Sequence, residues 1–311
     1  MKFYIVDAFA DTLFGGNPAG VVILDDGMDF PHSEQMRKTA AELRYSETAF
    51  IKPMGHNQFQ IRYFTPASEV DLCGHATIGS FVALADAGLT APGTDCICCT
   101  LAGDLNIQVS DGSVLMDMSA PEAIGEIADN MEQKELYEIM GIRPKHQGEI
   151  LFEGQLIPES KRLSEGKTGR LLIPEIISTG LPDILLPVEN EAALASIAPD
   201  FSALSRLSER YGVVGVHAFT VNSEDGAVHC RNFAPLYDID EEAATGTSNG
   251  ALTYYLYKNG LISENAVVRY IQGEAMARPS VITGRLSLVD GAVNIQVGGS
   301  AVILVRGTID L

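Results

Sequence analysis

Alternation of apolar and polar residues predicts β-strands along most of the chain. Short alternating runs are separated by turns rich in Gly, Pro, Asn and Asp. In the first half these runs are Lys2–Phe9, Ala19–Leu24, Thr48–Lys52, Gln58–Phe64, Asp95–Leu101, Asn106–Val109 and Val114–Met118. In the second half they are Val213–Val221, Val228–Phe233, Val267–Ile271, Ser280–Val289, Val293–Val297 and Ala301–Gly307.

Helical spacing of apolar residues is found in three segments. His32–Leu43 has its apolar residues on one face, as expected of a helix that covers a sheet. His75–Ala87 is too apolar all round for a surface helix, and Thr247–Lys258 is its counterpart in the second half. Because strands outnumber helices, we predict an α+β fold in which a curved sheet wraps one buried helix, not a doubly wound nucleotide-binding fold.

One pattern occurs in both halves. The pentad Arg62-Tyr63-Phe64-Thr65-Pro66 returns as Arg231-Asn232-Phe233-Ala234-Pro235, and each pentad precedes a small-residue turn and a helical run. A repeat of this length exceeds the period of a solenoid and indicates two similar domains. We expect them at residues 1–120 and 121–311, joined through the acidic, strand-poor segment Pro121–Asp129. The C-terminal strand could return to the first domain.

Composition and net charge restrict the classes of molecule that the protein can bind. The chain has 311 residues, 46% of them apolar, and a net charge of -20. Nucleic acids and anionic membranes are excluded as partners because they require clustered Lys and Arg. A small anionic ligand is not excluded, since helix N-termini supply local positive potential. No apolar stretch could span a membrane and no signal peptide is evident, so a cytoplasmic location is expected.

The cysteines do not indicate a metal or disulfide site. Five cysteines without a secretory signal argue against a disulfide framework. In the strand Asp95–Leu101, alternation places Cys96 and Cys98 on one face and Cys99 on the other. No pattern of zinc ligands is found, so buried structural thiols and no metal are expected. Phe14-Gly15-Gly16-Asn17-Pro18 is predicted to form a turn, and its glycines lack the pattern of a phosphate-binding loop. Gly298-Gly299-Ser300 is likewise predicted to be a turn and not a ligand site.

Two glycine-led helix starts could bind an anion. Gly74-His75-Ala76 and Gly246-Thr247-Ser248 would each present unpaired backbone N–H groups and a partial positive charge. Each turn alone is more simply a cap that starts a buried helix. The match between the two turns reverses that preference and favours a ligand held from both sides in a shared cleft.

Ionisable residues near these turns have open roles. Glu47, at the entry to a strand, is either a loop cap or a buried general acid and base. His75 is either a structural hydrogen-bonding residue or a proton carrier. Cys73 is either a stabilised thiolate or a small buried residue. The turns also contain Asp71, Glu241 and Glu242.

Several motifs in order along nearly the whole chain carry a family resemblance. They are Phe14–Val22, Ser46–Phe50, Thr65–Thr77, Arg231–Pro235, Glu241–Gly246, Gln272-Gly273 and Arg278–Ser280. With these motifs the chain resembles the PhzF-like (phenazine biosynthesis-like) isomerases, whose fold is that of diaminopimelate epimerase. The resemblance implies two pseudo-symmetric domains, each a curved, barrel-like mixed sheet around a central helix.

The resemblance also implies an activity and a set of site residues. The implied protein is a cofactor-independent isomerase or epimerase that moves a proton on a small carboxylic acid bound in the interdomain cleft. Whether it forms a homodimer is left open. The implied catalytic residues are Glu47, His75 and Glu242. The implied substrate-binding residues are Asn17, Cys73, Gly74, Ala76, Gly246, Thr247 and Ser248.

Two departures from the family pattern affect the mechanism. Glu242 replaces the family aspartate, and Thr247 replaces a serine while keeping its hydroxyl. A two-thiol mechanism needs a second cysteine where Thr245 stands, so a single-carboxylate shuttle through Glu47 is favoured. A catalytically silent relative that binds a small metabolite, or acts through protein contacts, is the alternative hypothesis. The sequence does not identify the substrate.

Overall fold

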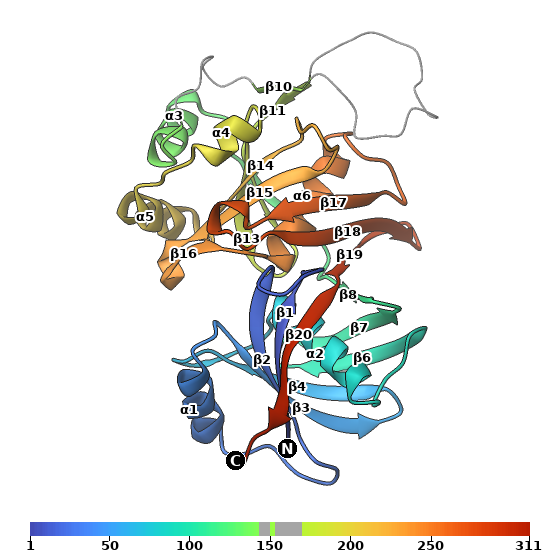
Figure 1. Ribbon diagram of the computed structural model, residues 1–311. Helices are drawn as coiled ribbons and strands as arrows, with labels where there is room; N and C mark the ends of the chain where they lie inside the picture. The colour runs from blue at the N-terminus through green and yellow to red at the C-terminus, as the bar shows by residue number, and fades with distance from the viewer. Residues whose placement is uncertain (143–149, 153–169) are drawn as a thin grey trace. The chain divides into compact units, whose positions relative to one another are not determined.

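The computed structural model describes residues 1–142, 150–152 and 170–311, and the chain divides into two compact units (Figure 1). The first unit comprises Met1–Asp117, Ala277–Ile282 and Val297–Leu311. The second comprises Met118–Met276 and Thr283–Gln296. The chain therefore leaves the first unit after Asp117 and returns to it twice.

The first unit contains two helices and a mixed sheet. Its helices are α1 (Ser33–Leu43) and α2 (Gly74–Asp86). Its strands are β1 (Lys2–Ala8), β2 (Asn17–Ile23), β3 (Thr48–Gly55), β4 (Gln58–Phe64), β5 (Glu69–Val70), β6 (Thr94–Thr100), β7 (Gly103–Ser110), β8 (Ser113–Asp117) and β20 (Ala301–Thr308). β20 pairs antiparallel with β1, so the end of the chain completes the sheet of the first unit.

The second unit has more helices. They are α3 (Asn130–Ile139), α4 (Glu191–Ala195), α5 (Phe201–Tyr211) and α6 (Gly246–Lys258), with short 3₁₀ turns η2 (Pro235–Tyr237) and η3 (Glu274–Met276). Its strands are β9 (Glu122–Glu126), β10 (Ile150–Phe152), β11 (Arg170–Leu172), β12 (Glu175–Ser178), β13 (Pro182–Pro187), β14 (Val216–Thr220), β15 (Val228–Ala234), β16 (Ile239–Glu242) and β17 (Val267–Gln272). Strands β18 (Ser280–Val289) and β19 (Ala292–Gly299) each contribute residues to both units.

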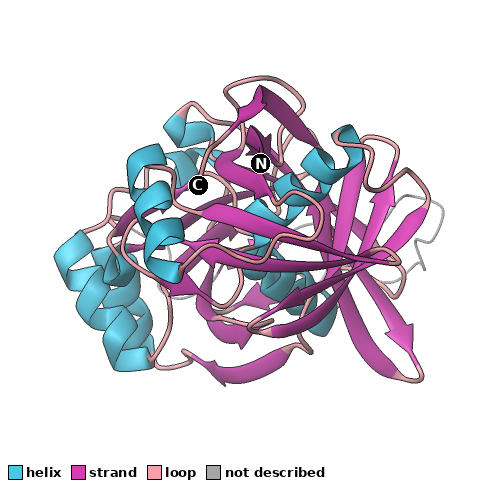
Figure 2. Cartoon of the chain, turned by 90° about the horizontal axis from the view of Figure 1, so that it is seen from below, coloured by secondary structure: helices cyan, strands magenta, loops and turns pink. Residues whose placement is uncertain are grey.

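The strand pairing repeats from one unit to the other. In the first unit β2 is parallel to β3, β3 antiparallel to β4, and β4 antiparallel to β5 and parallel to β6. In the second unit β13, β14, β15, β16 and β17 pair in the same order and with the same directions. Both units thus have the mixed, curved sheet that the family resemblance implies, and Figure 2 shows how strongly strands predominate.

Each sheet surrounds one central helix, as predicted. Helix α2 packs against β1, β2, β3, β8 and β20, and side chains such as Phe81 and Leu84 are fully buried (Figure 1). Helix α6 packs against β12 and β13, with Leu252 and Leu256 fully buried. Burial around most of the circumference explains why these two helices are apolar on nearly all sides.

The repeated pentad fastens the loop that leads into each central helix. Arg62 donates two hydrogen bonds of 2.6 Å to the carboxylate of Glu69 on β5. Arg231 makes the same paired contact, at 2.9 and 2.8 Å, with Glu241 on β16. Each guanidinium also lies over the phenylalanine ring of its own pentad, at 5.2 and 4.9 Å. In both units, an arginine that pairs with a carboxylate through two hydrogen bonds and stacks on a ring therefore sets the path of the loop.

Three sequence predictions about local structure are wrong. Segment Pro121–Asp129, predicted to be strand-poor, contains β9, which pairs with β12. Asn17, predicted to lie in a turn, begins β2 and pairs with Ala8. Gly298, also predicted to lie in a turn, belongs to β19. A Cβ atom at Gly298 would lie 1.9 Å from the Val114 carbonyl oxygen, so only glycine allows this close approach.

Helices α3, α4 and α5 were not predicted, although their start signals are present. Asp129 accepts hydrogen bonds from the amides of Met131 and Glu132 and caps α3. Asp200 caps α5 in the same way through the amide of Ala203. In the described part of the chain, none of the helices has both the length and the apolar character needed to span a membrane.

Candidate functional site

The start of α2 is held by hydrogen bonds within the first unit. The Cys73 carbonyl accepts the Thr77 amide at 3.0 Å and the Thr77 hydroxyl at 2.7 Å. The Thr77 hydroxyl also lies 2.7 Å from the buried Tyr63 hydroxyl. The Cys73 side chain makes no cap, so its thiol is not used to close the first turn. The result is a fixed helix N-terminus with the side chains of Cys73 and His75 available to other groups.

His75 is the centre of a compact polar cluster. Its side chain is almost fully buried, and its two ring nitrogens face different partners. Nε2 lies 3.3 Å from Glu47 Oε2 and 3.3 Å from Ser46 Oγ. Nδ1 lies 3.2 Å from Asn17 Nδ2 and 3.4 Å from Cys73 Sγ. The structure therefore places four residues around His75: Asn17 on β2, Ser46 and Glu47 in the loop before β3, and Cys73 at the start of α2.

The contacts of His75 define its protonation state. The amide nitrogen of Asn17 acts as a donor to Nδ1, which places the ring proton on Nε2, where Ser46 Oγ is the hydrogen-bond partner and Glu47 Oε2 lies equally close. Burial lowers the pKa of His75 below its ordinary value, while the nearby Glu47 carboxylate acts in the opposite direction. His75 is thus a neutral imidazole near neutral pH that can donate a hydrogen bond from Nε2 to a carboxylate.

Glu47 lies beside the His75 ring at the entry to β3. It directly precedes β3, and its side chain is 16% exposed. Among the described residues, no hydrogen bond reaches its buried Oε2 atom, whose close neighbour is the His75 ring. The backbone carbonyl of Glu47, by contrast, accepts the Gly20 amide at 3.3 Å. A carboxylate oxygen that is buried yet uncommitted is chemically suited to accept a proton from a ligand.

The loop that carries Asn17 is anchored by Arg278. The guanidinium donates to the carbonyl oxygens of Gly15 and Gly16, at 2.9 and 2.8 Å. It also pairs at 2.9 Å with Asp7, a carboxylate that is 2% exposed. This contact explains the Arg278–Ser280 motif: it fixes the backbone immediately before Asn17 and, through Asn17, the orientation of His75.

The start of α6 is built differently. Thr245 precedes the helix, and its hydroxyl donates to Glu242 at 2.5 Å. Gln272, fully buried on β17, donates to the Glu242 carbonyl at 2.8 Å and accepts the Thr245 amide at 3.2 Å. The longer side chain of Glu242 is therefore used to bond its own loop. Thr247 is half-buried, and its carbonyl accepts the Thr179 hydroxyl at 2.9 Å.

A buried polar network lies below this second helix start. The Ser248 hydroxyl donates to Asp183, and Asn232 donates to both Ser248 Oγ (3.1 Å) and His217 Nδ1 (3.2 Å). Burial raises the pKa of Asp183 to about 6, opposed by the Ser248 hydrogen bond, and lowers the pKa of His217 to about 4. The Ser248 hydroxyl is therefore committed to this network, and the whole residue is fully buried.

The predicted site residues fall into two groups. Asn17, Glu47, Cys73 and His75 form one cluster in the first unit, beside Gly74 and Ala76. Glu242, Gly246, Thr247 and Ser248 lie at the start of α6 in the second unit. That both groups act on one ligand stays a prediction. Of the other acidic candidates, Glu241 is committed to Arg231 and Asp71 is exposed.

Sequence reasoning missed several residues that orient the site: Ser46, Asp183, His217, Asn232 and Gln272. A buried polar residue inside an apolar strand is the available signal for His217 and Gln272. No short-range pattern identifies the partnership of Asp183 with Ser248, because β13 and α6 are far apart in the sequence.

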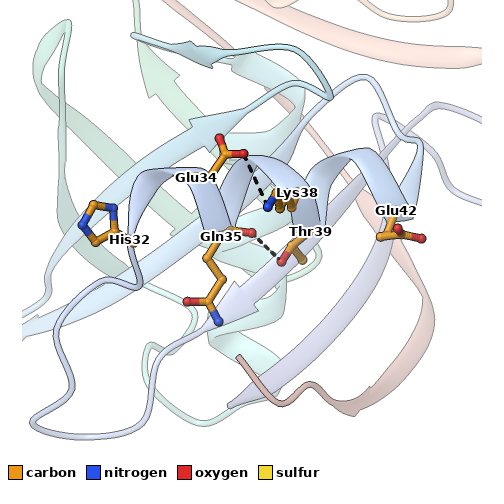
Figure 3. A pocket seen from close by; sticks show the side chains of 6 residues that line it. All are labelled: His32, Glu34, Gln35, Lys38, Thr39 and Glu42. Atoms are coloured by element: carbon orange, nitrogen blue, oxygen red, sulfur yellow. Dashed lines mark hydrogen bonds and ion pairs between the residues drawn. The ribbon is translucent and has the colours of Figure 1, made fainter.

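A surface pocket on α1 does not resemble a ligand site. It is lined by His32, Glu34, Gln35, Lys38, Thr39 and Glu42. Figure 3 shows that these side chains come from one helix and its preceding residue, with Lys38 pairing with Glu34 and Thr39 bonding the Gln35 backbone. Because no other element contributes a side chain, the cluster around His75 is the better candidate.

Comparison with known proteins identifies the family of the chain. The pattern of the phenazine biosynthesis-like protein family (PhzC-PhzF) matches residues 6–307. An uncharacterized isomerase of Clostridium acetobutylicum is 30% identical, with 100% of this chain and 98% of the relative covered. The trans-2,3-dihydro-3-hydroxyanthranilate isomerase of Pseudomonas chlororaphis is 30% identical, with 99% of each covered. A PhzF-family crystal structure from Bacillus anthracis superposes with a TM-score of 0.80 at 23% identity, covering 100% and 99% of the two chains.

Proposed function

Because the chain belongs to the phenazine biosynthesis-like (PhzC-PhzF) family, whose full-length relatives are isomerases, we propose a specific isomerase chemistry for it. The enzyme moves a proton between positions of a small carboxylic acid, without a cofactor. Glu47 removes the proton and returns it, and the start of α2 holds the substrate carboxylate.

The observation that carries this proposal is the environment of Glu47. Its Oε2 atom is buried, lies 3.3 Å from a neutral imidazole, and accepts no hydrogen bond from the described residues. A carboxylate in that state keeps a lone pair for a substrate proton. After proton transfer, the same oxygen carries the proton and can deliver it to a second carbon atom of the ligand.

His75 positions Glu47 during this cycle. Its Nε2 atom lies 3.3 Å from the carboxylate and within hydrogen-bond distance of Ser46, while Asn17 fixes the opposite side of the ring, so a small shift of Glu47 would let it accept the Nε2 proton. A neutral histidine can stabilise the charged carboxylate by a hydrogen bond without neutralising it permanently. The low pKa of His75 supports this role, because an imidazolium would bind Glu47 too strongly for it to act as a base.

A two-thiol racemase mechanism does not suit these residues. Cys73 lies beside His75, but Thr245 occupies the corresponding position before α6 and bonds Glu242. A threonine hydroxyl cannot act as a base near neutral pH. The single carboxylate Glu47 is therefore proposed to move the proton, with Cys73 as a neighbouring, non-essential thiol.

The second helix start is proposed to bind and orient the same substrate. Backbone amides of Gly246, Thr247 and Ser248 are suited to an anionic or polar group, and Glu242 is suited to an amine or hydroxyl. The substrate class is a small hydroxy or amino acid. Since a relative at 30% identity isomerises trans-2,3-dihydro-3-hydroxyanthranilate, that compound is the first to test. A cytoplasmic location, consistent with five free thiols, and a possible homodimer are part of the proposal.

Deuterium exchange tests the assignment. Candidate acids are incubated with enzyme in D₂O, and incorporation at carbon is followed by NMR. Glu47→Gln should lower exchange by roughly 10²–10⁴-fold, because it removes the general acid and base while preserving shape. Cys73→Ala is the matched variant and should keep most of the activity. An inactive Cys73→Ala beside an active Glu47→Gln would assign the chemistry to the thiol.

The same assay separates the alternative of a silent relative. A compound that raises the melting temperature binds the native state, whether or not it reacts. Binding without exchange, across a panel that includes the dihydroanthranilate, would contradict the proposed catalysis and favour a metabolite-binding protein.

A further inference from the structure

The cluster at the start of α2 contains three different metal-ligating groups. Glu47, Cys73 and His75 offer a carboxylate oxygen, a sulfur and a ring nitrogen that all lie within 4.8 Å of one another. Within the described residues these three side chains form one group from separate positions: the loop before β3, the N-cap of α2, and its first turn. The proposed proton shuttle uses Glu47 and His75, and it assigns no chemical role to the Cys73 thiol.

We propose that Cys73 Sγ, His75 Nε2 and a Glu47 carboxylate oxygen form an inhibitory site for one soft or borderline divalent cation, such as Zn²⁺ or Cd²⁺. The cation is not part of the proposed reaction. The inhibitory half of this inference rests on the proposed function, whereas the binding half does not.

The distances are close to those of a tetrahedral zinc site. With typical Zn–N, Zn–O and Zn–S bond lengths, a tetrahedral ion holds N and O about 3.4 Å apart and N and S about 3.6 Å apart. His75 Nε2 lies 3.3 Å from Glu47 Oε2 and 3.9 Å from Cys73 Sγ. Cys73 Sγ also lies 3.4 Å from Nδ1, so the thiol must turn about its Cα–Cβ bond to bring the sulfur in front of Nε2, toward the Glu47 carboxylate.

The surroundings also favour a cation of this kind. The three side chains are buried or half-buried, so they are already confined, and a fourth coordination position remains for water or a ligand. Sulfur and imidazole together select Zn²⁺ and Cd²⁺ over Mg²⁺ and Ca²⁺, which prefer oxygen ligands. Asn17 holds the second ring nitrogen, as outer partners of metal-bound histidines commonly do.

Metal binding requires that Cys73 loses a proton and that the His75 proton changes position. The Cys73 thiol gives its proton to the buffer as the thiolate–metal bond forms. The His75 proton moves from Nε2 to Nδ1, where the Asn17 side chain can accept it by turning its amide. The Glu47 carboxylate uses a lone pair on the metal and can no longer take a proton from the substrate, so isomerisation stops.

Titration of the full chain with Cd²⁺ and Zn²⁺ tests the site. We expect one equivalent of Cd²⁺ to produce the ultraviolet thiolate-to-cadmium absorption, and one equivalent of Zn²⁺ to bind in calorimetry. Cys73→Ala should abolish both signals, and His75→Gln or Glu47→Gln should weaken binding at least about tenfold. Mg²⁺ should give no signal.

Controls make each outcome decisive. Cys99→Ser removes the half-exposed thiol near Asp104, where adventitious binding would be easiest, and should leave binding unchanged. If Cys73→Ala does not unfold cooperatively, Cys73→Ser replaces it. Binding that survives loss of Cys73, binding lost with Cys99, or no binding by the parent would each overturn the inference.

These measurements do not depend on turnover. One-equivalent binding to a chain that exchanges no substrate would retain the metal site and contradict the proposed isomerisation. A chain that binds no Zn²⁺, and whose exchange activity Zn²⁺ does not change, would retain the proposed isomerisation and contradict the metal site.

Discussion

Asp183 and His217 should give the second unit two opposing pH dependences of stability. Burial raises the pKa of Asp183 from 3.8 to about 6 and lowers that of His217 from 6.5 to about 4. A carboxyl with a raised pKa binds its proton more tightly in the folded state. Its contribution to stability is therefore present at low pH and is lost as the pH rises from about 4 to about 6.

His217 acts with the opposite sign. Its imidazole is neutral when folded but takes up a proton more readily when unfolded, so stability is lost as the pH falls from about 6.5 toward 4. Each shift is about two pKa units or slightly more, and each therefore corresponds to about 3 kcal/mol. In the parent protein the two effects largely cancel, because they have opposite signs over nearly the same pH range.

Single variants separate the two effects. Asp183→Asn keeps an oxygen to accept the Ser248 hydroxyl but has no charge. Relative to the parent, its free energy of unfolding should improve by about 3 kcal/mol between pH 4 and pH 7, whatever constant offset the substitution brings. His217→Gln should show the reverse trend, with its relative gain at low pH.

Urea unfolding at a series of pH values measures both trends. Asp111→Asn is the matched control, because it removes the same charge from an exposed position. A stability difference between Asp183→Asn and the parent that stays constant from about pH 4 to pH 7 would refute the reasoning. It would mean that Asp183 is not desolvated in the folded state.

Two further predictions concern packing in the first unit. Gly298→Ala should cost roughly 3 kcal/mol, because the new methyl meets the Val114 carbonyl in the neighbouring backbone. Gly307→Ala on β20 has open space and should change little in the same thermal unfolding assay. Arg278→Ala should cost about 3 kcal/mol in urea unfolding by leaving Asp7 buried without its cation, and Asp7→Asn in that background should recover part of the loss. An Arg278→Ala variant as stable as the parent would show that the ion pair does not hold the loop.

The sequence predicts those parts of the fold that short-range patterns determine. Alternation located most strands, and apolar character on all sides located α2 and α6, because both are properties of a dozen or fewer neighbouring residues. The duplicated pentad predicted the duplicated topology for a physical reason. A bidentate arginine needs its glutamate at a set place in the following loop, and both halves supply one.

Features that depend on distant residues were not predictable in this way. Helices α3 and α5 bury only a few residues each, so their caps at Asp129 and Asp200 were the main signal. The Asp183–Ser248 contact and the Arg278 anchor join segments that are far apart along the chain. The family resemblance implied Glu47 and His75 as site residues, but their mutual contact, and the hydrogen bond by which Asn17 orients His75, required the structure.

Duplication explains why the scaffold is symmetric while the chemistry is not. Both central helices begin after a loop fixed by the same arginine–glutamate pair, so the backbone of either turn could present amides to a ligand. The side chains at the two turns make different contacts. The first turn leaves a buried carboxylate uncommitted beside a neutral imidazole, whereas the second uses Glu242, Thr245 and Gln272 to bond one another. Under the proposed mechanism, we therefore expect proton transfer to depend on the first unit's residues and substitutions at the second helix start mainly to change substrate affinity.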